Sequence, residues 1–170
     1  MSDLRLTRDY PHPPEKVWRA LTDCELLSRW LMETDFEPVV GHRFTLRTDP
    51  APGFDGIVRG EVRAVDEPRR IEFSWVGGPI DTVVTWELEA IPGGTRLVVT
   101  QRGFAGVKGW LVRAMLGRGS ATLYGRHLSA LLDAMDADGR APDFDTKVAC
   151  PEAGLFARFA ALFSSRKDPR

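Results

Sequence analysis

The sequence predicts an α+β protein in which a curved antiparallel sheet of about six strands wraps around a long C-terminal helix. Alternating apolar and polar residues mark one strand near the start and about five more between residues 41 and 102. Short turns join these later strands, so they should pair antiparallel as a meander. A helical period returns after Gly103, and a sheet with one apolar face needs such a cover.

A strand and two short helices are predicted before the main sheet. The stretch LRLTRDY, residues 4–10, alternates as a half-buried strand does. Pro14 suits the first turn of a helix, because its missing N–H would have no partner there. Thr22 and Glu25 stand at capping-box spacing, so a second helix should begin at that point.

The later strands are predicted from alternation and from the turn residues between them. Gly60 lies inside one of these runs and indicates a bulge or a close approach of two backbones. The stretch IPGG, residues 91–94, is typical of a tight hairpin. The predicted strands are residues 41–47, 57–65, 69–76, 82–90 and 95–102.

The covering helix follows the last strand. Residues 107–116 have a short amphipathic pattern, and the glycines of GRG at 117–119 should end it. Ser120 should then cap the long helix, since serine side chains satisfy free backbone N–H groups at helix starts. That helix carries an apolar stripe along one side, which would lie on the sheet.

The end of the chain reads as an appendage. Residues 138–150 are rich in Asp, Gly and Pro and predict a linker, while residues 151–167 predict one more amphipathic helix. We therefore expect a domain at 1–137 and a tail at 138–170. The apolar stripe of the tail helix could dock on the domain, pair two chains as a homodimer, or touch a membrane surface.

Composition restricts the classes of partner. The net charge is −1, from 23 basic and 24 acidic residues, so no overall field would attract nucleic acid. No stretch approaches the roughly 20 apolar residues of a membrane span, and the first ten residues lack an apolar signal core. The cysteines, Cys24 and Cys150, are few and far apart, which favours a reducing cytoplasm.

No motif predicts a metal or a cofactor. The three histidines, His12, His42 and His127, belong to different predicted elements, and no CxxC pair occurs. The glycine turns VGGP and PGGT join strand to strand, whereas a phosphate-binding loop opens a helix. We therefore expect no metal site and no bound cofactor.

Seven short stretches in a fixed order carry a resemblance. They are PPEKVWRALTDCELLSRWL (13–31), GHRF (41–44), GEV (60–62), EPRRIEFSW (67–75), VTWELE (84–89), GGTRLVVTQRGF (93–104) and YGRHLSALLDAM (124–135). Together they resemble the START-like, or SRPBCC, superfamily with its helix-grip fold. Within it they resemble the activator of heat-shock-protein-90 ATPase homologue type, which is grouped with polyketide cyclase-like proteins. The resemblance covers about residues 4–136, with departures at His42 and around Gly125 and Arg126.

The resemblance implies a deep cavity between the sheet and the long helix. The leading hypothesis is a protein that binds a hydrophobic small molecule there, with no assigned catalysis. One alternative is a cyclase or dehydratase acting on a polyketide-like or aromatic substrate, with His42 or Tyr124 as its acid–base group. The other is an interaction protein that stimulates a chaperone ATPase. The fold by itself does not choose among them.

The candidate cavity residues come from the predicted inner faces. Alternation places His42 beside Phe44, although a histidine at a strand end can also bond to backbone or water. An inward Gln101 without a protein partner would need a ligand or water. The aromatic residues could equally fill a solid core. The full set is Trp30, His42, Phe44, Phe73, Trp75, Trp86, Gln101, Tyr124, His127 and Leu128.

Overall fold

The structure, a computed structural model, describes residues 3–50, 54–105, 113–114 and 117–141. The predicted helix at 151–167 and most of the predicted helix at 107–116 lie outside the described residues. The elements are β1 (Leu4–Tyr10), α1 (Pro14–Thr22), α2 (Cys24–Trp30), β2 (Glu33–Thr34), β3 (Arg43–Arg47), β4 (Ile57–Asp66), β5 (Arg70–Gly77), β6 (Ile80–Ile91), β7 (Gly94–Arg102), the π-helical turn η1 (Leu123–His127) and α4 (Leu128–Ala134).

Within the described ranges, the strands form one sheet in the order β1-β7-β6-β5-β4-β3-β2, and every neighbouring pair is antiparallel. The predicted meander is therefore confirmed. The sheet has seven strands where the sequence predicted about six. The additional strand is β2, whose two residues are too short to show an alternating pattern in the sequence.

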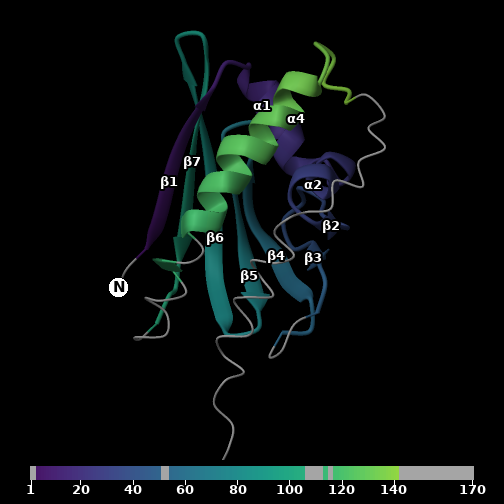
Figure 1. Ribbon diagram of the computed structural model, residues 1–170, viewed down its shortest axis with the longest axis vertical. Coiled ribbons are helices and arrows are strands. Elements are labelled where there is room, and N and C mark those ends of the chain that lie inside the picture. The colour runs from purple at the N-terminus through teal and green to yellow at the C-terminus, as the bar shows by residue number, and fades with distance from the viewer. Residues whose placement is uncertain (1–2, 51–53, 106–112, 115–116, 142–170) are drawn as a thin grey trace, which may run out of the picture.

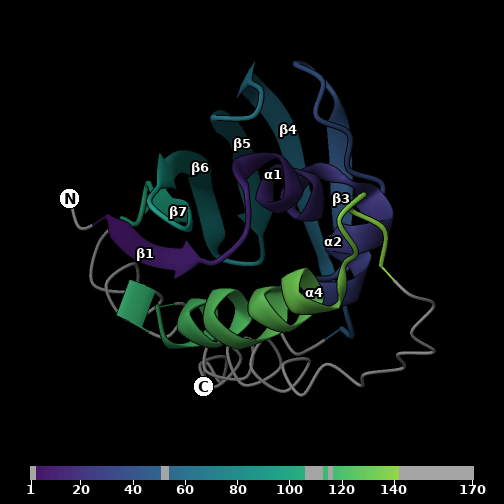
Figure 2. The same ribbon diagram turned by 90° about the horizontal axis from the view of Figure 1, so that it is seen from above.

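The sheet curls around the covering helix, as the helix-grip prediction requires. Figure 2 shows η1 and α4 lying along the concave side of the sheet, between β1 at one edge and α2 near the other. Helices α1 and α2 close one end of this arrangement (Figure 1). Residues 117–122 are also helical and run directly into η1, so the cover is one continuous helix.

A chain of aromatic rings fills much of the space between the helices and the sheet. The Trp30 ring lies 5.4 Å from Tyr124 and 6.3 Å from Trp86, measured between centroids. Trp86 meets Phe73 edge to face at 4.8 Å, and Phe73 meets Phe44 at 5.6 Å. Such pairs add about 0.5–1.5 kcal/mol each beyond the burial of their area. Trp30 of α2 thus packs against strands formed later in the chain.

The N-cap of α2 differs from the prediction. Asp23 caps the helix, because its Oδ1 accepts hydrogen bonds from the N–H groups of Glu25 and Leu26, both at 3.0 Å. The Thr22 hydroxyl instead donates to the Trp18 carbonyl at 2.8 Å, within the last turn of α1. Two helices follow each other with a single residue between them, and only Asp23 stands outside both.

The predicted break before the covering helix is also wrong. Residues 117–119 are helical, so Ser120 lies inside the helix and is not its cap. Two glycines in a helix cost roughly 1 kcal/mol each relative to alanine. Close packing explains their position in part, since a Cβ on Gly117 would lie 3.2 Å from Leu4 Cδ1. Gly119 borders a cavity, described next.

Candidate functional site

A small cavity lies between the inner face of the sheet and the start of the covering helix. Strands β5, β6 and β7 form one wall, the end of α2 another, and the helix before and within η1 the third. Its volume is about 40 Å³. That volume holds on the order of three water molecules, at roughly 10–15 Å³ each. The lining residues are Leu31, Met32, Trp75, Val84, Val99, Gln101, Gly119, Ser120, Leu123 and Tyr124.

Three of the predicted site residues, Trp75, Gln101 and Tyr124, meet at this cavity. Two others, His42 and His127, are half-buried and do not line it. The remaining five are buried in the packed core away from the cavity wall: Trp30, Phe44, Phe73, Trp86 and Leu128.

His42 faces the backbone of a neighbouring loop. Its Nε2 lies 2.9 Å from the carbonyl oxygen of Asp35, so this nitrogen carries the hydrogen and donates it. The Asp35 carboxylate accepts a hydrogen bond from the Thr45 N–H at 2.7 Å. That backbone hydrogen bond is the main cause that holds the pKa of Asp35 below its usual value. The hydrogen bond of His42, which lies directly before β3, therefore connects the start of that strand to the loop that contains Asp35.

Tyr124 joins the cavity to the core. The Trp86 indole Nε1 donates to its hydroxyl at 2.8 Å, and the Tyr10 hydroxyl donates to its backbone carbonyl at 2.6 Å. Tyr124 stands in η1, where Leu128 N–H bonds to the Leu123 carbonyl five residues back. Such π-turns often occur at functional sites. Burial raises the pKa of Tyr124 far above its ordinary value, so its hydroxyl stays protonated.

Two polar groups of the sheet reach the same cavity. The Trp75 side chain is 8% exposed, and its Nε1–H is buried with no hydrogen-bond partner in the structure. The Gln101 side-chain amide is 7% exposed, and its Nε2 donates to the Thr82 hydroxyl at 2.7 Å. The sequence placed Gln101 inward but did not reveal Thr82, because that partner is on the neighbouring strand.

The lining combines apolar walls with a few neutral hydrogen-bonding groups. Among the described lining residues none carries a charge or titrates near neutral pH. Such a site can hold an apolar molecule and orient it through one or two hydrogen bonds. Proton transfer would require an acid or base whose pKa lies near the working pH, whereas burial raises the pKa of the Tyr124 hydroxyl in this lining far above its ordinary value.

Sequence reasoning did not assign several lining residues to a site. Leu31 and Met32 follow α2, and Gly119, Ser120 and Leu123 belong to the helix turn before and within η1. Leu31 was part of an apolar stripe, and that stripe could have been extended to Met32. Nothing in the local pattern shows that Gly119 faces a cavity, because the glycines there indicated a helix break.

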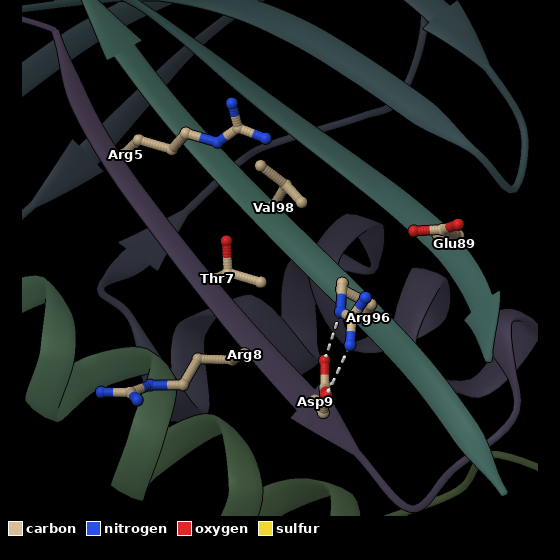
Figure 3. A pocket seen from close by; sticks show the side chains of 7 residues that line it. All are labelled: Arg5, Thr7, Arg8, Asp9, Glu89, Arg96 and Val98. Carbon is tan, nitrogen blue, oxygen red and sulfur yellow. Dashed lines mark hydrogen bonds and ion pairs between the residues drawn. The ribbon is translucent and has the colours of Figure 1, made fainter. Parts of the chain in front are cut away.

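Larger hollows lie on the outer face of the sheet and are open to solvent. One, of about 600 Å³, carries mixed charges (Figure 3). The Arg96 guanidinium bonds to Asp9 at 2.9 and 3.1 Å across β1 and β7, and this lowers the pKa of Asp9. Because this hollow is open to solvent and its Asp9 carboxylate is already paired with Arg96, we do not regard it as the site. Its lining is Arg5, Thr7, Arg8, Asp9, Glu89, Arg96 and Val98.

The described part of the chain contains neither a candidate metal-binding cluster nor a candidate membrane-spanning helix. Within it, no three side chains of His, Cys, Asp or Glu gather closely enough to hold a metal ion. No helix there is both long and apolar enough to cross a membrane.

An antiparallel sheet curled around one long helix, with a cavity beneath that helix, is the helix-grip architecture of the START-like, or SRPBCC, superfamily. The chain belongs to one family within it: residues 11–133 match the family model described as Activator of Hsp90 ATPase homolog 1-like protein. This confirms the family resemblance and the fold class predicted from the sequence. No curated protein matches the chain.

Solved structures support the same assignment. The protein MLL2253 from Mesorhizobium loti is 34% identical over 79% of this chain and 99% of that chain, with a TM-score of 0.71. DynU16, a protein of the dynemicin biosynthetic locus, is 24% identical over 78% of this chain and 48% of that chain, with a TM-score of 0.64. The Aha1 dimer from Colwellia psychrerythraea is 19% identical over 79% of this chain and 96% of that chain, with a TM-score of 0.65. The last two show the fold alone.

Proposed function

We propose that the protein binds an apolar small molecule in the cavity between β5–β7 and the start of the covering helix. One observation carries the proposal. An otherwise tightly packed aromatic core leaves a cavity whose walls are mostly apolar, and three predicted site residues, Trp75, Gln101 and Tyr124, border it. Apolar pockets with a few convergent polar groups are the usual form of a small-molecule site.

The size of the cavity limits how a ligand enters. A cavity of about 40 Å³ accepts only one end of a molecule unless lining side chains move. Met32 is the lining residue best suited to move, because an unbranched thioether side chain adapts its shape at low cost. In this proposal one end of the ligand fills the cavity, and the rest lies where Met32 is displaced.

Native mass spectrometry of the full chain, purified gently from cells, tests the proposal. We expect a non-covalent small-molecule adduct that leaves on denaturation. Val99→Phe should reduce the adduct strongly, because Val99 lines the cavity and the larger ring would fill it. Overpacking of this kind costs about 1–3 kcal/mol, so far-UV circular dichroism must show that the variant is folded.

Val98→Phe is the matched control, since Val98 is the next residue on β7 and points to the outer face. It should keep the adduct. An adduct that survives Val99→Phe, or one that is lost equally in both variants, would contradict this cavity as the site. A clean mass for the wild-type chain would favour the interaction role, in which the partner is a chaperone ATPase.

Two further proposals concern the pairing of chains, which the same spectrum examines, and the location of the protein. Pairing of two chains through the helix predicted at 151–167 would appear as a dimer, and removal of that segment should abolish it. A cytoplasmic location is supported by Cys24, which is exposed and unpaired as thiols are in reducing compartments.

A further inference from the structure

The polar groups of the cavity lie on the inner faces of strands that flank β6. Trp75 on β5 pairs with Thr82 on β6, and Gln101 on β7 pairs with Val84 on β6. Strand β6 lies between Trp75 and Gln101, so their backbones are two inter-strand spacings apart, about 9.6 Å. Both side chains line the same cavity. The Gln101 amide reaches back across β6 to Thr82, the residue paired with Trp75, and so extends toward the Trp75 side of the cavity.

The orientation of the Gln101 amide follows from its partner. In the structure the Thr82 hydroxyl donates to the Trp75 carbonyl at 3.3 Å. Its oxygen accepts from the Gln101 Nε2–H at 2.7 Å. The other amide atom, Oε1, accepts no hydrogen bond from any described residue. It remains an available acceptor.

Trp75 supplies the complementary group. Its Nε1–H is a donor only, it is buried, and it has no partner. A buried donor left unpaired costs about 1–3 kcal/mol, so such groups in native proteins are usually satisfied by water or a ligand. The cavity therefore offers the unpaired Trp75 N–H as a donor and Gln101 Oε1 as an acceptor, with the hydroxyls of Ser120 and Tyr124 also in its lining.

We propose that the ligand of this cavity carries an uncharged hydroxyl group, as a phenol does, whose oxygen accepts from Trp75 Nε1–H and whose hydrogen is donated to Gln101 Oε1. This rests on the function proposed above and names its substrate class. A ketone or an ether would accept from the Trp75 Nε1–H but has no hydrogen to donate to Gln101 Oε1. A carboxylate would bring a charge into walls that carry none among the described lining residues, which is costly to bury. A hydroxyl is the smallest group that satisfies both atoms.

Four one-ring compounds separate these alternatives: phenol, anisole, toluene and benzoate. Binding is measured by isothermal titration calorimetry and by ¹H–¹⁵N spectra of the indole N–H groups. The chain has five tryptophans, and Trp75→Phe identifies the Trp75 resonance by its disappearance. We expect phenol to bind about tenfold more tightly than toluene, since two net hydrogen bonds contribute roughly that factor. Phenol should shift the Trp75 resonance, and benzoate should not bind.

Variants test each hydrogen bond. Gln101→Leu should remove the preference for phenol over anisole. Trp75→Phe should reduce anisole binding to the level of toluene and should weaken phenol binding, since phenol keeps only the hydrogen bond to Gln101. Thr100→Leu, on the opposite face of β7, should change neither. Circular dichroism checks that each variant is folded, and Gln101→Leu alone suffices should Trp75→Phe fail to fold.

The outcomes separate this inference from the function on which it rests. Equal binding of phenol, anisole and toluene, all lost in Val99→Phe, would overturn hydroxyl recognition and leave the apolar cavity as the site. Absence of binding by all four compounds, with an unmoved Trp75 resonance, would overturn hydroxyl recognition and mean that water satisfies the indole. The adduct measured by native mass spectrometry would then decide the function independently.

Discussion

Gly60 lies where two strands and an aromatic ring come close together. A Cβ at this position would lie 2.5 Å from the Ser74 carbonyl oxygen and would overlap the Phe44 ring. The Glu61 N–H bonds to the Ser74 hydroxyl at 2.9 Å, so the ladder between β4 and β5 is irregular here. The sequence indicated a bulge or a close approach at Gly60. The structure shows the close approach, and the register shift lies a few residues further along β4.

Gly60→Ala should therefore destabilise the protein by about 2–3 kcal/mol, the cost typical of overpacking a core, because hydrogen-bonded strands cannot move apart freely. Urea unfolding followed by circular dichroism measures the change. Gly41→Ala is the control: Gly41 has a φ of 86° but nothing within 4 Å of an added Cβ. The Gly41→Ala variant should lose only about 1 kcal/mol in the free energy of unfolding, because of backbone strain. A smaller loss for Gly60→Ala than for Gly41→Ala would contradict the packing argument.

At the scale of elements, the junction of α1 and α2 shows how two short helices are held in place. Helices of nine and seven residues are marginal by themselves, and packing and capping stabilise them. Trp30 Nε1 donates to the Ala20 carbonyl at 2.9 Å, which ties the end of α2 to α1. Asp23 satisfies two free N–H groups at the start of α2.

Asp23→Ala should cost about 1 kcal/mol in the free energy of unfolding, the usual effect of losing an N-cap. Asp23→Asn should recover most of it, since the amide oxygen can accept the same hydrogen bonds. Thermal and urea unfolding of both variants provide the measurement. If Asp23→Ala were neutral and Asp23→Asn equally so, the capping assignment would be wrong.

For the molecule as a whole, the two tyrosines report on folding at alkaline pH. Tyr10 and Tyr124 are the only tyrosines in the chain, and both are buried. Burial is the main cause that raises the pKa of each above its ordinary value. A phenol whose pKa is raised by folding contributes stability that is present below the unfolded pKa of about 10 and is lost as pH rises above it.

We therefore expect unfolding and tyrosine ionisation to occur together as the pH is raised above about 10. In one titration, the near-UV absorbance of tyrosinate follows the ionisation and far-UV circular dichroism follows the unfolding. The chain in concentrated guanidinium chloride is the control, and its tyrosines should ionise near pH 10. Ionisation at that pH with a native circular dichroism spectrum would show that burial does not protect the hydroxyls.

The sequence by itself determined the order of the elements and the family. Alternation and short turns are local signals, so they place strands and predict their antiparallel pairing without knowledge of the rest of the chain. Where local signals competed, they misled. Thr22 and Glu25 matched a capping box that Asp23 replaces, and two glycines indicated a helix break at residues 117–119, which are helical.

The tertiary structure alone decided which polar side chains remain available and where the core is hollow. Gln101 and His42 were both predicted to face inward, yet their partners, Thr82 and the Asp35 carbonyl, were not foreseen. Those partners lie across a strand or in a loop, at distances set by register and packing rather than by sequence period. Trp75 has an unpaired indole N–H for the same reason: the atoms around a buried group are brought there by elements distant in sequence.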